Sequence, residues 1–273
     1  MAPRTPAKKK TAAPPPEPPK PVGLEQRTAE LEFRLRRAGR PFQERYRIDL
    51  DMSWIRHDSG IEGVPYTLDE LRGAIEGPPP LPDEGIPHPS LGEIRRHREA
   101  LAYVRKSAID QIPITLDVVK RIYCILHPEE GDAKSVKYRR DVPQHRLYFH
   151  EYTPPEKIPA KMRGIFEWFH DPQTWKARSA LRIACRAHYD ILRVFPFTSD
   201  SGKVARLFMN LVLLKHGYPP AIIDTRERQR YYEALKTANT FMTVLVQDAV
   251  ESLLSSVEKQ LDQLEGRTRA VLR

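Results

Sequence analysis

The 273-residue sequence has no uninterrupted apolar run approaching the roughly eighteen residues of a membrane span. Its N-terminus lacks the apolar core of a secretory signal peptide. Cysteine is scarce, and Cys124 and Cys185 both lie in apolar helical patterns without the spacing of metal ligands. These absences predict a reduced, cytoplasmic setting, no membrane partner, and two thiols buried as small side chains.

The sequence also lacks an internal repeat of solenoid length, and its 40% hydrophobic and 30% charged residues are ordinary for a globular protein. Much of the net charge of +9 comes from residues 1–23, a Pro-, Ala- and Lys-rich tail predicted to be disordered. No nucleic-acid-binding motif accompanies this charge, so specific recognition of nucleic acid is not expected.

Apolar residues recur at three- and four-residue steps through most of the remaining chain, which predicts a mostly α-helical fold. One helix starts at Leu24 and another ends near His57. The predicted N-caps are Thr67, Ser90 and Thr115. Further helical patterns cover residues 158–170, 174–194, 204–216, 228–239 and 243–267.

Two stretches depart from the helical pattern. The Pro-rich residues 77–90 predict a loop, and the alternation in residues 138–155, YRRDVPQHRLYFHEYTPP, predicts a β-hairpin arm. The expected organisation is a tail at 1–23, an N-terminal helical region at 24–110, a core at 111–250 and a helical extension at 251–273. The apolar stripe of this extension predicts packing on its own domain, with a homodimer as the alternative. The stripe consists of Val250, Leu253, Val257, Leu261 and Leu264.

The stretch FPFTSDSGKVAR, residues 195–206, joins two apolar helical runs. Gly202 permits backbone angles that turn successive N–H groups into one concavity at the start of a helix. Lys203 and Arg206 are three residues apart, so both reach the same side of the first helical turn. From these residues alone, an anion-binding loop and a capped helix start with solvated cations are equally compatible.

Several separated segments resemble one family. Residues 187–223, AHYDILRVFPFTSDSGKVARLFMNLVLLKHGYPPAII, resemble the Fic (Fido) domain, whose signature reads H-P-F-x-[D/E]-G-N-G-R-x-x-R. Residues 53–71, SWIRHDSGIEGVPYTLDEL, are similar to the family's N-terminal segment with its S/T-x-x-x-E-G/N inhibitory motif. Residues 146–169 look like the family's flap hairpin and its exit. The resemblance spans about residues 45–250 and implies the helical Fic fold with one β-hairpin.

The loop departs from the signature where the family carries its chemistry. Phe195 stands at the signature histidine, Ser199 at the acidic position, Asp200 at the first glycine, Ser201 at the asparagine and Lys203 at the first arginine, whereas Pro196, Phe197, Gly202 and Arg206 match. In the inhibitory motif, Asp58 fills the hydroxyl position and Glu62-Gly63 match. The resemblance therefore identifies a degenerate motif.

Active Fic proteins usually transfer AMP from ATP to a hydroxyl of another protein. Their histidine removes the hydroxyl proton, their carboxylate holds Mg²⁺, and their glycine-rich loop and arginines hold the phosphates. The resemblance thus implies ATP and Mg²⁺ as cofactors and a protein partner along the flap near Arg146–Tyr152. It implies regulatory roles for Glu62 and Gly63, with Glu62 reaching Arg206. The implied phosphate-binding residues are Ser199, Ser201, Gly202, Lys203 and Arg206.

The substituted positions predict impaired catalysis. Phe195 cannot accept a proton, and a general base typically contributes about 10²- to 10⁴-fold. Ser199 is a poor Mg²⁺ ligand, which leaves Asp200 as the candidate metal carboxylate. Among other histidines, His188 is predicted to be a packed structural residue, and His127 and His150 are predicted to be still less well placed for chemistry.

Three functions stay open at this point. The first is a degenerate Fic-domain protein, impaired as an AMP transferase, that binds a nucleotide or a protein. The second is an active nucleotidyl- or phosphotransferase in which Asp200 and Lys203 take new roles. The third is a nucleic-acid-associated accessory protein. We also predict that Phe195→His alone restores little AMP transfer, and that Arg206→Ala abolishes nucleotide binding and leaves the fold intact.

Overall fold

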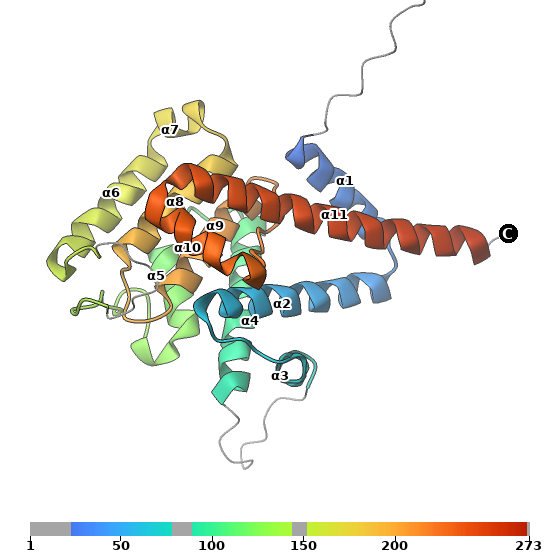
Figure 1. Cartoon of the computed structure of the whole chain (residues 1–273), viewed down its shortest axis with the longest axis horizontal. Coiled ribbons are helices and arrows are strands. Elements are labelled where there is room, and N and C mark those ends of the chain that lie inside the picture. The colour runs from blue at the N-terminus through green and yellow to red at the C-terminus, as the bar shows by residue number, and fades with distance from the viewer. Residues whose placement is uncertain (1–22, 78–88, 144–151, 272–273) are drawn as a thin grey trace, which may run out of the picture.

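The computed structural model describes residues 23–77, 89–143 and 152–271, and these residues are mostly helical (Figure 1). Within these ranges, no helix is both long and apolar enough to cross a membrane. The N-terminal region contains α1 (Leu24–Arg37), α2 (Arg40–Glu62), α3 (Leu68–Ile75) and α4 (Pro89–Ile109). The later helices are α5 (Leu116–Leu126), α6 (Ile158–His170), α7 (Pro172–Ala177), α8 (Ala180–Val194), α9 (Ser201–Lys215), α10 (Arg228–Thr237) and α11 (Asn239–Val271).

Helix α9 is the centre of the hydrophobic core. Its sequence, SGKVARLFMNLVLLK, is apolar on nearly every face, and all residues from Ser201 to Leu213 except Lys203 are buried. A helix that is apolar all round must be covered on all sides. Helices α8, α4 and α5 pack against it, so the loop that precedes α9 begins inside the molecule rather than on its rim.

The helix ends show where local sequence rules hold. Thr67 and Glu70 form the predicted capping box at the start of α3, with each side chain bonded to the backbone of the other residue. Ser90, by contrast, lies inside α4, where its hydroxyl donates to Glu70 Oε1 at 2.9 Å. Helix α2 continues five residues beyond the expected end at His57.

The long helical pattern at residues 174–194 is divided in the structure. Helix α7 ends at Ala177, and the Ser179 side chain accepts a hydrogen bond from the Arg182 N–H at the start of α8. A serine N-cap satisfies an otherwise unpaired helix N–H, so it fixes a new helix start within a continuous apolar pattern.

The predicted β-hairpin is not supported. Residues 138–143 and 152–155, at the two ends of the predicted segment, contain no strand, and residues 144–151 lie outside the described part of the chain. Arg139 shows what these backbone groups do instead, since its N–H donates to the Pro196 carbonyl at 3.0 Å. At Arg139, therefore, the backbone bonds to the loop at residues 195–200 and not to a partner strand.

Two contacts attach the N-terminal helices to the core. A Cβ atom at Gly60 of α2 would clash with Thr225 Oγ1, so only glycine allows this close approach between α2 and the turn at Thr225–Glu227. Helix α1 packs on α11, where the Arg27 guanidinium donates to Glu258 at 2.8 Å. Three residues of the predicted stripe of α11 pack within the molecule, since Val250, Val257 and Leu261 are at most 2% exposed, whereas Leu253 and Leu264 are partly exposed.

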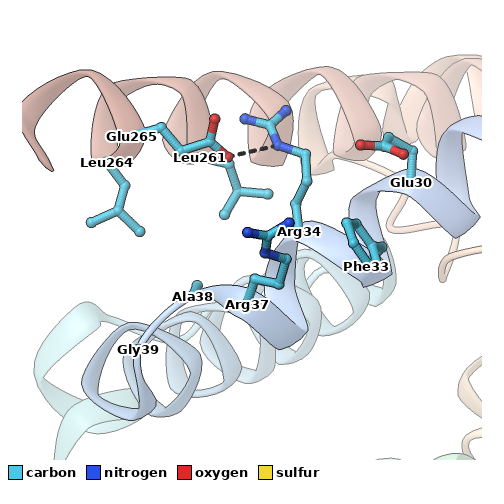
Figure 2. A pocket seen from close by; sticks show the side chains of 9 residues that line it. All are labelled: Glu30, Phe33, Arg34, Arg37, Ala38, Gly39, Leu261, Leu264 and Glu265. Atoms are coloured by element: carbon cyan, nitrogen blue, oxygen red, sulfur yellow. Dashed lines mark hydrogen bonds and ion pairs between the residues drawn. The ribbon is translucent and has the colours of Figure 1, made fainter. Parts of the chain in front are cut away.

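The far end of α11 and the end of α1 enclose an open groove of about 670 Å³ (Figure 2). Phe33 is 48% exposed along it, and Arg34 crosses it to Glu265 with a donor–acceptor distance of 3.0 Å. None of its lining residues belongs to the predicted site.

Candidate functional site

Residues 195–200 form the loop between α8 and α9, and both of its ends adopt left-handed backbone conformations. Phe195 has φ 49° and ψ 67° at the end of α8, and Asp200 has φ 49° and ψ 17° directly before α9. Gly202 lies within the first turn of α9 and is not among the left-handed residues. The left-handed backbone angles expected at Gly202 are thus found at Phe195 and Asp200 instead. Because both residues carry Cβ atoms, this conformation costs roughly 1–2 kcal/mol at each of them.

Phe195 fills the position of the signature histidine with a buried ring. Only 4% of its surface is exposed, and the ring meets Tyr152 edge-on with centroids 5.4 Å apart. An aromatic ring in this place contributes packing but has no lone pair for a proton.

Arg139 is hydrogen-bonded to the Phe195 end of the loop. It is 4% exposed, and its guanidinium donates to four carbonyl oxygens, including that of Phe195 at 2.6 Å and that of Val194 at 3.1 Å. Burial lowers the pKa of Arg139, but its hydrogen bonds satisfy the charged form. A cation at the last carbonyls of α8 also complements the helix dipole.

Ser201 closes the loop on itself. Its Oγ accepts a hydrogen bond from the Phe197 N–H at 2.9 Å and donates to the Phe197 carbonyl at 3.1 Å. Phe197 is fully buried and stacks on Tyr123 of α5, with centroids 4.0 Å apart and an interplanar angle of 5°. The Ser201 hydroxyl, predicted to face a phosphate, therefore lies in the protein interior.

Asp200 lies between Lys203 and His127. Its Oδ1 is 3.0 Å from Lys203 Nζ, and its Oδ2 is 2.9 Å from His127 Nε2. Burial alone would raise the pKa of Asp200, but the hydrogen bond from His127 and the charge of Lys203 outweigh it and hold this pKa below its ordinary value. Asp200 is thus an ionised carboxylate with a nitrogen donor at each oxygen.

His127, which was predicted from the sequence to be poorly placed for chemistry, contacts both Asp200 and Ser199. It follows the last residue of α5, and its Nδ1 lies 3.0 Å from Glu129 Oε1. Its Nε2 is also 3.2 Å from Ser199 Oγ. The hydrogen bond with Asp200 raises the pKa of His127, and Glu129 adds to the effect against burial.

Arg206 lies beneath the loop, 3% exposed, and is held by the N-terminal helices. Its Nη2 donates to Glu62 Oε1 at 2.7 Å, which is the pair the inhibitory-motif resemblance implies. Its Nε pairs with Asp58, and Nη1 donates to the Tyr231 hydroxyl at 3.2 Å. Gly63 ends α2 with φ 88°, so Glu62 stands at the very end of the helix beside Arg206.

Asp58 provides the second carboxylate that pairs with Arg206. This pairing was not predicted from the sequence, because the family motif has a hydroxyl residue at the position of Asp58. Asp58 is 5% exposed, and its Oδ2 lies 3.1 Å from His97 Nε2 on α4. Burial opposes its ionisation, but Arg206 and His97 together hold the pKa of Asp58 below its ordinary value. The cavity that adjoins Asp58 and Arg206 has a volume of about 10 Å³, room for no more than one water.

His188 has the structural character predicted for it. It is fully buried, and its Nε2 lies 3.0 Å from the hydroxyl of Tyr231. Burial, with a contribution from Arg206, lowers the pKa of His188 to about 3, so this imidazole is neutral. His150 lies outside the described residues.

The residues of the loop do not fit a magnesium ion. The described residues contain no group of three or more His, Cys, Asp or Glu side chains suited to a metal. Both oxygens of Asp200, the predicted metal carboxylate, already face nitrogen donors, and Ser199 offers only a neutral hydroxyl. The two predicted phosphate-binding cations are likewise engaged, Lys203 by Asp200 and Arg206 by two carboxylates.

Comparisons with known proteins bear on the family and the fold of this chain. Residues 113–213 match the Fic/DOC family model. The chain is 30% identical over 194 residues to the protein adenylyltransferase Fic of Nematostella vectensis, covering 68% of this chain and 42% of that protein. It is also 30% identical over 192 residues to the Drosophila willistoni protein of the same name, covering 36% of it. The chain therefore spans about two fifths of the length of these relatives.

Solved structures show the same fold. A Fic domain-containing signaling protein from Bacteroides thetaiotaomicron superposes with a TM-score of 0.69 at 18% identity, over 88% of this chain and 98% of that one. Residues 134–508 of Fic-1 from C. elegans superpose with a TM-score of 0.65 at 22% identity, over 89% and 71% of the two chains. The chain thus contains a domain of the Fic/DOC family with the helical Fic fold.

Proposed function

We propose that this protein is a degenerate Fic-domain protein, impaired as a protein AMP transferase, that acts by binding. The observation that carries the proposal is the buried Phe195 ring at the position of the signature histidine. Proton removal from the acceptor hydroxyl has no group to perform it at that position, and a general base typically accounts for about 10²- to 10⁴-fold of the rate.

The charges around the loop favour a protein as the bound partner over a nucleotide. A nucleotide needs unpaired cations for its phosphates, but Lys203 is paired with Asp200, and Arg206 with Asp58 and Glu62. Phosphate binding in this arrangement would have to displace carboxylates that are themselves part of the fold, at a cost in stability. These ion pairs support binding without nucleotide.

The partner segment is expected along residues Arg146–Tyr152, and this stays a prediction because residues 144–151 lie outside the described chain. Tyr152 supports it indirectly. The Tyr152 ring is packed on Phe195. One end of the segment of this chain that is expected to bind the partner therefore contacts the substituted position directly.

Transfer of labelled AMP tests the proposal. The wild-type protein and Phe195→His are incubated with α-labelled ATP, Mg²⁺ and lysate proteins. Both are expected to label nothing above a no-protein blank, because restoring an imidazole does not restore the metal position. Robust labelling by the wild type, or by Phe195→His alone, contradicts the proposal. Calorimetric titration with ATP and Mg²⁺ separately measures whether nucleotide binds.

One contact favours an active alternative. Ser199 Oγ lies 3.2 Å from His127 Nε2, and the other ring nitrogen faces Glu129, which is a hydroxyl–imidazole–carboxylate order found in activated hydroxyls. In this alternative, a transferase uses His127 in place of the missing histidine. Labelling that is present in the wild type and lost in His127→Ala, but kept in the control His216→Ala, would establish it.

A further inference from the structure

Two oxygens of the loop that could ligate a metal converge on one nitrogen atom. Asp200 Oδ2 lies 2.9 Å and Ser199 Oγ 3.2 Å from Nε2 of His127. These residues stand at and directly after the acidic position of the family signature. Oxygen ligands of a hard cation converge in this manner on the ion. Here the point of convergence is an imidazole nitrogen supplied by the end of α5.

The imidazole is fixed in this place by several neighbours. Its other nitrogen faces Glu129 Oε1 at 3.0 Å, and its ring lies 4.8 Å from the Tyr123 ring one turn earlier on α5. Tyr123 in turn stacks on Phe197 of the loop, so the end of α5 and the loop are packed together beside the histidine. The end of α5 also favours a positively charged group through the helix dipole.

Both oxygens of Asp200 are occupied without an added ion. Lys203 Nζ lies 3.0 Å from Oδ1 and His127 Nε2 lies 2.9 Å from Oδ2, while the other ring nitrogen of His127 faces Glu129. A magnesium ion would have to approach a carboxylate oxygen to about 2.1 Å, where these nitrogen atoms already lie against both oxygens. The ammonium group of Lys203 would also repel the ion.

We infer that the imidazole of His127 takes the place of the divalent cation at this loop, so that the loop is complete without a metal. The inference stands apart from the question of AMP transfer, because a metal-free loop is compatible with an inactive protein and with a His127-dependent enzyme alike. His127 acts here as a positioning residue that holds Asp200 and Ser199.

Binding of Mn²⁺, a paramagnetic substitute for Mg²⁺, tests the inference. The free Mn²⁺ signal in electron paramagnetic resonance is titrated with wild-type protein and with Asp200→Asn. The two proteins are expected to give the same titration, with no loop site tighter than about 1 mM, a weak affinity even for cation sites. Wild-type binding tighter than this that is lost in Asp200→Asn overturns the inference.

A variant designed to gain Mn²⁺ binding tests whether His127 occupies the position of the metal ion. In His127→Asp, a carboxylate replaces the imidazole at the point where Asp200 and Ser199 converge, and Mn²⁺ affinity is expected to rise at least tenfold over wild type. The rise must disappear when Asp200→Asn is added. The control His216→Asp replaces an exposed histidine that stacks on Trp175 and is expected to leave the Mn²⁺ affinity unchanged. A folded His127→Asp protein that gains no Mn²⁺ affinity overturns the inference. If circular dichroism shows that the His127→Asp protein is unfolded, the comparison of Mn²⁺ binding by the wild type and by Asp200→Asn still tests the inference.

Discussion

Replacing Arg206 with alanine removes the cation from a cluster in which Asp58 and Glu62 both depend on it. Asp58 is 5% exposed and Arg206 3%, so water cannot replace the lost guanidinium at Asp58. Breaking a buried ion pair on one side costs about 3–5 kcal/mol because a charge is left buried and unpaired. Such a loss is a large part of the roughly 5–15 kcal/mol that stabilises a typical domain. The sequence alone predicted that Arg206→Ala leaves the fold intact, and the burial of Arg206 replaces that expectation.

Urea unfolding followed by far-ultraviolet circular dichroism measures this cost. Arg206→Ala should lower the free energy of unfolding by about 3–5 kcal/mol, which corresponds to a fall in melting temperature of roughly 6–20 °C. The matched control is Arg186→Ala, which breaks an ion pair with Asp190 in which the Arg186 side chain is 50% exposed. An exposed pair of this kind contributes about 0.3–0.5 kcal/mol.

A double variant separates the ion pair from the loss of packing. Asp58→Asn combined with Arg206→Met removes both charges and keeps a long side chain, so it should recover about 2 kcal/mol of the loss seen in Arg206→Ala. The reasoning is refuted if Arg206→Ala costs less than about 1 kcal/mol, or if the double variant is no more stable than Arg206→Ala. Either outcome would mean that the ion pair between Arg206 and Asp58 contributes little to the stability of the fold.

Three further predictions concern the cap, the titrating histidine and the thiols. Thr67→Ala removes the hydroxyl that accepts from the Glu70 N–H, while the bond from the Thr67 N–H to the Glu70 side chain can remain, and it should cost about 1 kcal/mol in urea unfolding; an unchanged midpoint would show that α3 does not depend on this cap. Since the folded-state pKa of His127 is raised, its contribution to stability is complete below the unfolded-state pKa of about 6.5 and is lost as pH rises through the folded value. The stability difference between wild type and His127→Ala should therefore shrink above neutral pH, and a difference that grows with pH contradicts the assignment. Burial raises the pKa of Cys185 to about 12 and also raises that of Cys124, so neither thiol should react with Ellman's reagent until urea unfolds the protein, and rapid labelling of the folded protein would disprove their burial.

Local patterns were enough to predict most of the helices. Helix α6 has the bounds that its apolar spacing predicts, and the capping box of Thr67 and Glu70 is present because both partners lie within one helical turn. The break before Ser179 was missed, since the apolar period continues through it and only the cap reveals a new start. Periodicity reports which face is buried, but it does not report whether the backbone is continuous.

The site was only partly predictable because its partners are far apart in the sequence. The pairing of Glu62 with Arg206 came from a family motif, not from any local pattern. His127 reaches Asp200 across 73 residues, and Asp58 reaches Arg206 across 148, and no period or spacing encodes such contacts. A histidine directly after an apolar helix and before Pro-Glu-Glu was the one available indication for His127, since a nearby acid favours its charged form.

Helix α11 joins the helices of the core to the first N-terminal helix. It runs for 33 residues, about 50 Å, from the helices of the core to a point beyond α1 (Figure 1). Arg27 and Arg34 attach α1 to the outer half of α11, so movement of α1 as a rigid body would have to break these ion pairs. Separation of Glu62 from Arg206 does not need such a movement, because Glu62 is the last residue of α2 and a change of its side chain alone breaks the pair.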